Sequence, residues 1–427
     1  MTKKTKLDKP SQNQLLLLFG IIIICSFLVW ICAIIISPEG MQRSLFFLEM
    51  KDFWADGTNT TGLASIRNPY LDDSIGLENA AYPPLAYDLF YLLAHASKAP
   101  SNGYLDYYYQ PLWTMIFTIA IYMSVLLIYI VNSRQFNDGN KGAILACVAI
   151  LLSRPMLYTI ERGNILIIAV VAICVFIYYY DSADKLKKEI AILCLAIAAA
   201  IKLTPALLGI LLIYKKDWKA AMRTLIYGIL FFVVPFFFLQ GGIHNLSQML
   251  KNVQAHVAHY SYVSSGTGLI ESINKYGKMI FGGGWYIKGE IRISIELIKN
   301  IICIVLLLGG SVIKEKWKKV LNVVVVLLIY PSVSGQYCLL YLIPFTVLFF
   351  RHTESVDNVK STDYIITGCL IMVYFMYRCW ISEILDYNFA IPVLSIVALY
   401  FSIKELKGFL GEYNKGRIEQ NQEDVVK

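Results

Sequence analysis

The sequence predicts an all-α integral membrane protein with about twelve transmembrane helices. Of its 427 residues, 57% are hydrophobic and only 16% are charged, which is far from the composition of a soluble globular domain. Apolar runs long enough to cross a bilayer alternate with short loops that carry Lys and Arg. The net charge of +8 is spread over these loops, so we interpret it as a topology signal and expect no nucleic-acid partner.

The first predicted helix covers residues 14–36 and follows a basic N-terminal segment, MTKKTKLDK. Lysines in this segment keep the N-terminus in the cytoplasm, so the helix carries the chain to the outer side. The apolar run is longer than that of a signal peptide, and it has no convincing cleavage site of small residues. We therefore predict an uncleaved first span.

The stretch at residues 190–216 is decisive for the topology, because basic clusters lie at both of its ends, at 185–188 and 215–223. The positive-inside rule places both clusters in the cytoplasm, which a single spanning helix cannot do. We expect a hairpin of two short helices with Lys202 at its outer tip and Thr204 as the cap of the second helix. The alternative is one span with a proline kink and a snorkelling Lys202 side chain.

Further apolar segments complete the predicted bundle. They cover residues 111–131, 143–160, 165–180, 224–239, 293–313, 320–350, 364–385 and 389–406. The run at 320–350 also has a cytoplasmic-looking loop at each end, so we expect a second hairpin that breaks at 331–336. Counting each hairpin as two helices gives about twelve spans, both termini in the cytoplasm and two long outer loops, at 37–110 and 242–292.

We expect one integral-membrane domain over residues 1–427. A catalytic-type module at 1–241, with the first outer loop, precedes the second outer loop, the C-terminal helices at 293–406 and a cytoplasmic tail at 407–427. Within the first outer loop, the segment AYPPLAYDLFYLLAHA contains Asp88 and His95. These polar residues make it an interfacial or half-inserted helix rather than a full span.

The sequence gives no indication of a metal or a cofactor. All nine cysteines lie in or beside apolar segments without metal-like spacing, so we expect neither disulfides nor zinc. Asp52 and Asp56, four residues apart, could share an ion, but no further ligand set accompanies them. We therefore assign no metal and no cofactor.

The predicted outer turns carry an unusual concentration of polar residues. They are Asp52 and Asp56 in the first outer loop, Arg162 and Asn164 in a tight turn, Lys202 at the hairpin tip, and Gln336 with Tyr337 at the second break. Ionisable residues at membrane depth are costly and are functional candidates by default. A carboxylate beside two or three cations suits an anionic lipid headgroup, since the cations hold phosphate and the carboxylate takes a proton.

This combination is sufficient for glycosyl transfer from a lipid-phosphate sugar. The phosphate is a good leaving group once its charge is compensated, so no general acid is required. One carboxylate base can activate the acceptor hydroxyl. A single direct displacement inverts the anomeric carbon, so the lone base predicts an inverting enzyme.

Each candidate also has a purely structural interpretation. Asp52 and Asp56 can be ordinary loop carboxylates. Arg162 can pair with the adjacent Glu161, and Asn164 can be the cap of the helix that follows its turn.

The remaining candidates lie on the predicted acceptor side. His256 and His259 are three residues apart beside aromatic residues, and they are better explained as acceptor-side or structural residues than as metal ligands. Tyr82, before two prolines, can simply begin the following helix.

At AAAIKLTPALLGILLIYKKDWKA the chain resembles glycosyltransferase family 87, the polyprenyl-phosphate-sugar-dependent enzymes of the GT-C superfamily. Further segments are similar in order: KDFWADG, NPY, AYPPLAYDLF, RGNILIIAVV and YPSVSGQYCLLYLIPF. In RGN, Arg162 stands in the glutamine-like region of a Gly-Gln-x-Asn turn. In the last segment, Gly335, Gln336 and Tyr337 replace the family's tryptophan and histidine, so no cation is supplied there.

The resemblance implies a GT-C-like bundle, with a catalytic aspartate early in the first outer loop, at the position of Asp52. It also implies a polyprenyl-phosphate donor, commonly a mannose donor, used with inversion on the outer face of a bacterial cytoplasmic membrane. We expect Lys202, Arg162, Asn164, Gln336 and Tyr337 to bind the donor phosphate. Asp56, His256, His259 and Tyr82 are acceptor-side or secondary residues.

Two other functions remain open. A flippase for lipid-linked sugars would also use broken helices and intramembrane cations, although the span interiors at 115–131 and 301–308 contain no Asp, Glu, Lys, Arg or His. A polymerase of lipid-linked repeat units would share the outer-face site. The sequence does not specify the sugar, the acceptor, the linkage or the oligomeric state.

Overall fold

The computed structural model describes residues 14–38, 40, 55–65, 68–71, 80–96, 119–121, 123–129, 140–260, 266–331, 334–356 and 358–426. Its secondary structure is helical, with 82% of the described residues in helices and no strand among them. The predicted all-α class is therefore confirmed.

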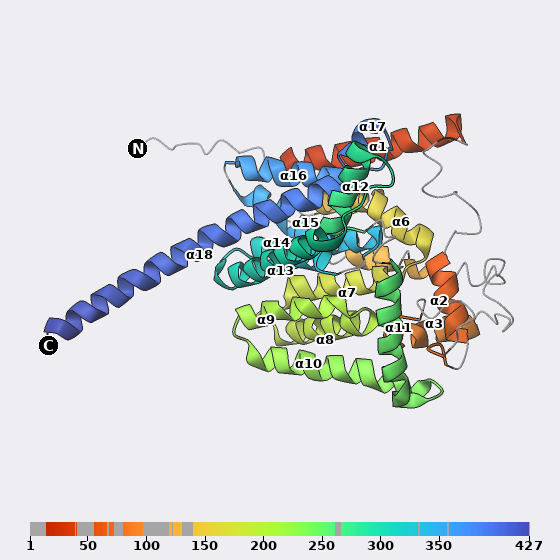
Figure 1. Cartoon of the computed structure of the whole chain (residues 1–427), viewed down its shortest axis with the longest axis horizontal. Helices are drawn as coiled ribbons and strands as arrows, with labels where there is room; N and C mark the ends of the chain where they lie inside the picture. Colours follow the sequence, from red (N-terminus) through yellow and green to blue (C-terminus); the bar gives the residue numbers. More distant parts are fainter. Residues whose placement is uncertain are drawn as a thin grey trace, which may run out of the picture.

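The helices pack into an elongated bundle from which the last helix projects (Figure 1). The α-helices are α1 (Gln14–Ile36), α2 (Ala55–Ser65), α3 (Pro84–Ala96), α5 (Asn140–Leu151), α6 (Arg154–Arg162), α7 (Leu166–Tyr179), α8 (Lys185–Ile201), α9 (Ile210–Tyr214), α10 (Trp218–Val233), α11 (Asn245–Tyr260), α12 (Leu269–Phe281), α13 (Gly289–Val312), α14 (Lys316–Ile329), α15 (Leu342–Ser355), α16 (Ser361–Tyr374), α17 (Trp380–Ile384) and α18 (Tyr387–Val426). The 3₁₀ helices are η5 (Thr204–Gly209), η6 (Val234–Phe238), η7 (Gly242–His244) and η8 (Gln336–Tyr341).

Helix α1 has the bounds that the sequence predicts, Gln14–Ile36. Among the described residues, it is one of three helices that are long and apolar enough to cross a membrane, with Trp218–Phe238 and Tyr387–Glu412. The bent pair of α5 and α6 makes a fourth candidate. Other apolar helices of the described part are shorter, so the total of about twelve spans stays a prediction.

The predicted span at 143–160 consists of a bent pair of helices. Helices α5 and α6 meet at an angle of 53°, and Ser153 at the break donates its hydroxyl hydrogen to the Ile150 carbonyl at 2.6 Å. Pro155 lies in the first turn of α6. Because proline has no backbone N–H and its ring clashes with a preceding helical turn, a new helix starts there.

Loops that we predict to be cytoplasmic gather at one end of the bundle, which we call the basic end. The Lys316 ammonium at the start of α14 lies 2.6 Å from the Asp181 carboxylate. Lys215 Nζ donates to the Asp181 carbonyl at 3.4 Å. Three loops far apart in the sequence therefore meet here, as the positive-inside rule requires if they share one side.

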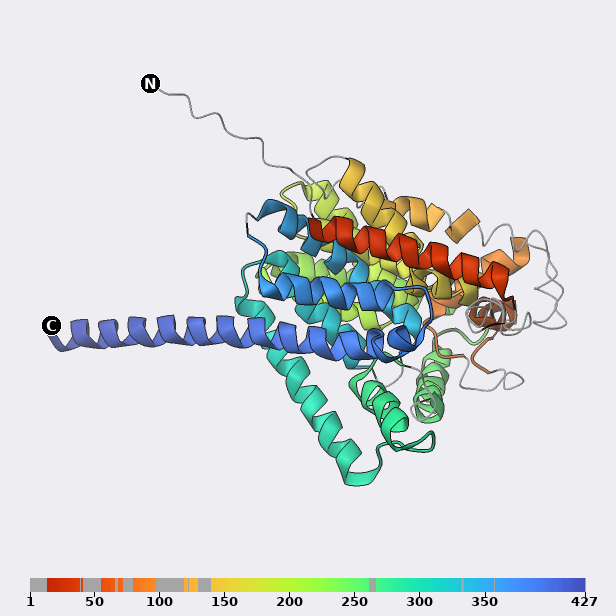
Figure 2. The ribbon, with the colours of Figure 1, turned by 90° about the horizontal axis from the view of Figure 1, so that it is seen from above.

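Helices α1 and α18 also reach the basic end. Near the start of α1, the Phe19 ring lies 5.0 Å from the ring of Phe350. Phe401 of α18 packs edge-on against Trp317, 5.6 Å away. Beyond this contact α18 leaves the bundle (Figures 1 and 2). The start of the first helix and the end of the last one therefore lie at the same end of the molecule.

The stretch at 190–216 is a hairpin, as predicted. Lys188, in the first turn of α8, forms an ion pair with Asp217, just after α9. These residues are 29 positions apart, and in one continuous helix they would be separated by about 44 Å. The single kinked span is therefore excluded, and Lys202 lies at the tip as the C-cap of α8.

The return arm of this hairpin differs from the prediction in detail. It starts with the 3₁₀ helix η5, whose cap residue is Leu203 and which has no side-chain cap bond. Thr204 is therefore not a cap. Its hydroxyl instead lies 3.0 Å from the hydroxyl of Tyr341, at the end of η8.

The run at 320–350 is a second hairpin, formed by α14, η8 and α15. The rings of Trp317 and His352, near its two ends, stack at 5.0 Å, so both arms reach the basic end. Between its two arms lie η8 and the predicted break at 331–336, of which the structure describes residues 331 and 334–336. Because Thr204 contacts Tyr341, the two hairpins meet tip to tip.

We expect Asp217→Ala to destabilise the first hairpin. Asp217 pairs with Lys188 and accepts a hydrogen bond from the Ala220 N–H as the N-cap of α10, so the loss is about 1–2 kcal/mol. The Lys188 ammonium lowers the pKa of Asp217 below 3.8. A lowered pKa means that this contribution is present above pH ~4 and disappears as the pH falls through the lowered pKa.

Thermal unfolding at about pH 7 and about pH 3 measures this effect. At the neutral pH, the melting temperature of the wild type should be higher than that of Asp217→Ala. At the acidic pH, the difference between the two melting temperatures should be smaller. Asp184→Ala is the matched control, because Asp184 caps α8 but makes its contacts within the first turn of that helix. Equal melting temperatures for wild type and Asp217→Ala at neutral pH would contradict the expectation.

The predicted second outer loop, 242–292, is largely helical. Helix α11 is oriented steeply to α7, α8 and α10 (Figure 1), and α12 and the start of α13 follow it along the chain. Buried Asn252 of α11 donates to the carbonyls of Tyr70 at 3.1 Å and Ala80 at 3.3 Å, in the first outer loop. The two predicted outer loops therefore pack against each other.

The predicted C-terminal boundaries, 364–385 and 389–406, are also wrong. Helix α16 ends at Tyr374, and the short helix α17 follows after a break. Helix α18 continues through the predicted tail as far as Val426. The tail is rich in good helix formers such as Glu, Lys and Gln, which hydropathy does not detect.

Candidate active site

The end of the bundle opposite the basic end, which we call the site end, contains a carboxylate bound by two residues of one turn. Asp56 Oδ1 accepts hydrogen bonds from Arg162 Nη2 at 2.7 Å and Arg162 Nε at 3.1 Å. Asp56 Oδ2 accepts one from Asn164 Nδ2 at 2.9 Å. Both carboxylate oxygens are thus engaged. About a quarter of each side chain of the ion pair is exposed, 25% for Arg162 and 24% for Asp56.

The turn at residues 162–164 has a local cause. Gly163 ends α6 in the left-handed region, at φ 62°, where glycine adds no steric cost. The Asn164 side-chain oxygen accepts a hydrogen bond at 3.0 Å from the N–H of Leu166, the first residue of α7. The N-cap of α7 is Ile165 rather than Asn164, and Asn164 joins the start of this helix to Asp56.

Gly57 allows α2 to approach this turn closely. A Cβ atom at Gly57 would lie 2.9 Å from the Gly163 carbonyl oxygen, closer than real Cβ atoms come to other atoms. Since the neighbour is backbone, it cannot rotate away. The absence of a side chain at position 57 therefore sets the distance at which Asp56 meets Arg162.

We expect Gly57→Ala to weaken this contact and to reduce activity. The added methyl group forces α2 away from the turn, at a cost of about 1–3 kcal/mol. Thermal unfolding and transfer activity of the purified protein measure the effect. Gly228→Ala is the control, because Gly228 lies in helix α10 with no atom within 4 Å of its added Cβ. An unchanged Gly57→Ala enzyme would show that the close approach is unimportant.

Tyr82 extends the network of Asn164. Asn164 Nδ2 also donates to the Tyr82 hydroxyl oxygen at 3.3 Å. Burial raises the pKa of Tyr82 above its ordinary value of 10.0, and the nearby Asp56 charge adds to this. Tyr82 therefore stays a neutral phenol that can donate a hydrogen bond. It does more than begin α3, which starts at Pro84.

Lys202 and Tyr337 bring the two hairpin tips together beside this network. The Lys202 ammonium lies over the Tyr337 ring, 4.4 Å from its centroid. Among the described residues, no carboxylate lies within ion-pair distance of Lys202. The electrostatic influence of both Tyr82 and Asp56 reaches Tyr337. The ammonium is thus a cation at the site end that is available to a ligand.

Gln336 begins η8, directly before Tyr337. The sequence interpretation missed Tyr341, whose hydroxyl holds Thr204 and joins the tips. The four-residue spacing of Tyr337 and Tyr341 places both rings near one face of a helical turn, and it could have indicated this role.

Other predicted site residues have different outcomes. Asp52 lies outside the described residues. His256 and His259 both lie on α11, which packs on the first outer loop. His256 is half-buried, and the side chain of His259 is outside the described part. Asp56, predicted for the acceptor side, is instead joined to the predicted donor-phosphate residues Arg162 and Asn164.

The site end combines the ion pair of Arg162 and Asp56 with the Lys202 ammonium, which has no carboxylate partner among the described residues. Such an arrangement binds an anionic group at the free ammonium and offers neutral hydrogen-bond donors beside it. Within the part of the chain that the structure describes, no group of three or more His, Cys, Asp or Glu residues is placed to hold a metal ion.

Comparison with known proteins identifies the family. A sequence model of glycosyltransferase family 87 matches residues 80–331, more than half of the chain. No curated protein matches the chain significantly. The matched range includes Tyr82, the turn with Arg162 and Asn164, and Lys202, and it confirms the family that the motifs predict. The chain therefore belongs to glycosyltransferase family 87 and is a membrane glycosyltransferase.

Proposed function

We propose that this enzyme transfers a hexose, mannose in the first instance, from a polyprenyl-phosphate sugar to a hydroxyl group of a glycolipid or cell-surface glycan. The reaction takes place at the site end, on the outer face of a bacterial cytoplasmic membrane. It inverts the configuration of the anomeric carbon. The enzyme needs no cofactor for this reaction.

The available ammonium of Lys202 is the observation that best supports this donor. A polyprenyl-phosphate sugar carries its negative charge on one phosphate, and a cation without a carboxylate partner binds such a group. Gln336 and the Tyr337 hydroxyl can donate hydrogen bonds to its oxygens. Arg162 contributes less, because the Asp56 carboxylate already balances its charge. Asn164 helps to orient the group.

Asp52 is the proposed base. Asp56 is less suitable, because Arg162 and Asn164 already donate hydrogen bonds to both of its oxygens, so the carboxylate is committed to these two residues. Four residues of chain limit the separation of the Asp52 and Asp56 Cα atoms to about 15 Å. Asp56 therefore serves as a brace that ties this part of the first outer loop to the site end.

The reaction is a single displacement. The Asp52 carboxylate takes the proton of the acceptor hydroxyl group, whose oxygen attacks the anomeric carbon from the face opposite the phosphate. The bond between this carbon and the phosphate oxygen breaks, and Lys202 stabilises the negative charge on the departing polyprenyl phosphate. His256, His259 and Tyr82 lie toward the acceptor.

A transfer assay with purified protein tests the function. The protein is incubated with a panel of radiolabelled polyprenyl-phosphate monosaccharides and oligosaccharide-diphosphate lipids, together with simple glycoside acceptors. We expect a new glycosidic bond of inverted configuration with a monosaccharide donor only. Transfer from oligosaccharide-diphosphate lipids would instead indicate a polymerase. Movement of labelled lipid across liposomes without a new bond would indicate a flippase.

A further inference from the structure

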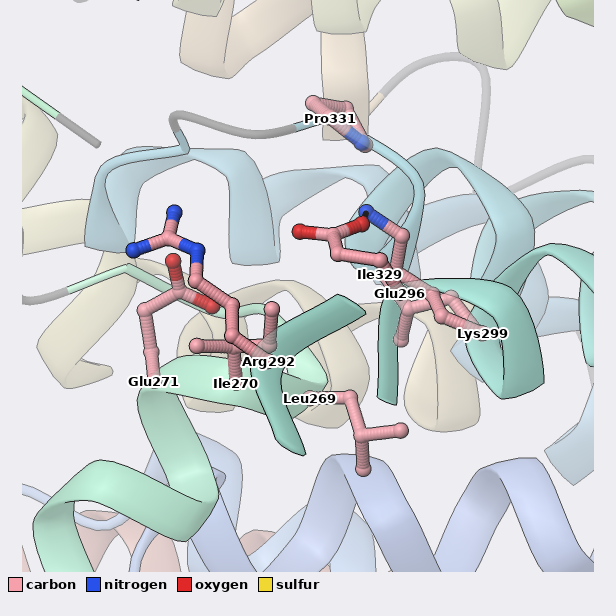
Figure 3. Close-up of a pocket in the computed structure, with 8 residues that line it drawn as sticks. All are labelled: Leu269, Ile270, Glu271, Arg292, Glu296, Lys299, Ile329 and Pro331. Carbon is pink, nitrogen blue, oxygen red and sulfur yellow. Dashed lines mark ion pairs between the residues drawn. The ribbon is translucent and has the colours of Figure 1, made fainter. Parts of the chain in front are cut away.

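The charged pocket between α12, α13 and the end of α14 is too small for a substrate. Its charged lining residues are Glu271, Arg292, Glu296 and Lys299 (Figure 3), and the Lys299 ammonium forms an ion pair with Glu296. The space that remains holds about one water molecule. The exposed surface of helix α11 offers a larger area of contact.

Three stripes of side chains run along helix α11, Asn245–Tyr260. Each stripe repeats at intervals of four and three residues, which is the spacing of one helix face. The buried stripe is Asn245, Met249 and Asn252; the apolar stripe is Leu246, Leu250, Val253 and Val257; and the polar stripe is Ser247, Lys251 and Gln254.

The apolar and polar stripes both reach the surface. Leu250 of the apolar stripe is 51% exposed and Val257 is 37% exposed, and the polar stripe is exposed along its length. Consecutive residues such as Leu250 and Lys251 are about 100° apart around a helix, so the two stripes form separate flanks. A helix with one apolar and one polar flank suits the boundary between lipid and water.

Helix α10 with η6 locates such a boundary beside α11. The segment Trp218–Phe238 is long and apolar enough to cross a membrane, and only 11% of its apolar window is buried, so most of its side chains face lipid. It rises by more than about 30 Å, the thickness of the hydrocarbon core. It starts at the basic end, where Asp217 pairs with Lys188. Its other end, where Phe237 is 67% exposed, reaches the opposite membrane surface.

Helix α11 follows directly after that end of the span. Residues 239–244 separate Phe238 from Asn245, and α11 is oriented steeply to α10 (Figure 1). A helix that begins at the end of a span and turns steeply away from it lies close to the membrane plane. The exposed apolar stripe of α11 therefore comes next to the exposed apolar end of α10.

We infer that α11 is an interfacial helix that binds the phospholipid surface at the site end. Its apolar stripe inserts among the acyl chains, and its polar stripe faces the headgroups and water. Lys251 of the polar stripe can pair with anionic headgroups. This interaction goes beyond the proposed function and does not depend on it.

The buried stripe ties the first outer loop to this membrane surface. Asn252 donates to the carbonyls of Tyr70 and Ala80, and Asn245 Oδ1 accepts a hydrogen bond from Asn68 Nδ2 at 2.9 Å. A helix held in the interface therefore fixes the level of this loop relative to the lipid. In the proposed function, the same loop carries the base.

Photo-crosslinking in liposomes of phosphatidylcholine and phosphatidylglycerol tests the inference. The photoreactive residue p-benzoylphenylalanine replaces Leu250 in one variant and Lys251 in the matched control, and intact-mass measurement identifies the adducts. We expect a several-fold higher yield of phospholipid adduct from position 250 than from position 251. Equal yields from the two positions, or a covalent dimer from position 250, overturn the inference, the second in favour of a contact between two copies.

Thermal unfolding in phosphatidylcholine liposomes is a second test that needs no photoreactive residue. Leu, Lys and Glu have similar helix propensities, so Leu250→Glu and Lys251→Glu should both be harmless if α11 is surrounded by water. In lipid, Leu250→Glu should lower the melting temperature, because its carboxylate leaves water for an apolar environment. Lys251→Glu is the control and should melt like the wild type. Equal melting temperatures of Leu250→Glu and the wild type overturn the inference.

Discussion

Replacing Asp52 with Asn should lower kcat by about 10²–10⁴-fold, the range that a positioned general base contributes. The amide has nearly the same shape as the carboxylate but cannot accept the proton of the acceptor hydroxyl group. The donor KM should change little, because Lys202 rather than Asp52 binds the phosphate. Initial rates with the donor identified by the lipid panel measure both constants.

Three further variants make this prediction specific. Asp72→Asn and Asp73→Asn remove carboxylates from the same predicted outer loop and should retain activity. Asp56→Asn should reduce the rate by a smaller factor than Asp52→Asn, because it weakens the brace to Arg162 and leaves the base in place. A larger loss of activity in Asp56→Asn than in Asp52→Asn would show that Asp56 is the base and that Asp52 is not.

Replacing Lys202 with Met should raise the donor KM by about 10–100-fold, because charge-assisted hydrogen bonds to phosphate contribute about 1.5–3 kcal/mol. Methionine keeps an apolar contact with the Tyr337 ring and loses only the charge. Lys202→Arg should retain part of the affinity, since guanidinium also binds phosphate. Binding of unlabelled polyprenyl phosphate as a competitor measures the same loss without catalysis.

Lys219→Met is the matched control for Lys202→Met. Lys219 is an exposed lysine near the first turn of α10 at the basic end, so its loss should leave the donor KM unchanged. If the donor KM is the same in Lys202→Met as in the wild type, Lys202 does not bind the donor phosphate. The donor class itself would then rest on the family alone.

The part of the fold that the sequence predicts well depends on short-range physics. The bounds of α1 follow from an unbroken apolar run, and the hairpin at Lys202 follows from basic clusters on both of its flanks. The positive-inside rule identified the reversal at Lys202 although the apolar stretch has the length of one span. The contact of Lys188 with Asp217 then bears out this reasoning.

Other features depend on contacts that a single sequence does not contain. Asp56 meets Arg162 across 106 residues, and the approach depends on Gly57 lying against Gly163. No local pattern indicates that pairing, and the sequence placed Asp56 on the acceptor side for this reason. The continuation of α18 was missed for a different reason, because hydropathy records where an apolar run stops and not where a helix ends.

The two broken hairpins have a consequence for the lipid around them. Helix α8 has 17 residues and α14 has 14, so they rise by about 26 Å and 21 Å, less than the roughly 30 Å of a bilayer's hydrocarbon core. If the basic end lies at the cytoplasmic surface, as the topology predicts, the tips with Lys202 and Tyr337 stop several ångströms short of the opposite surface. We then expect the bilayer to thin or to admit water above them, at a modest cost per ångström. This depression would let a lipid phosphate sink to the level of the ammonium, and it ties the working of the enzyme to the thickness of its membrane.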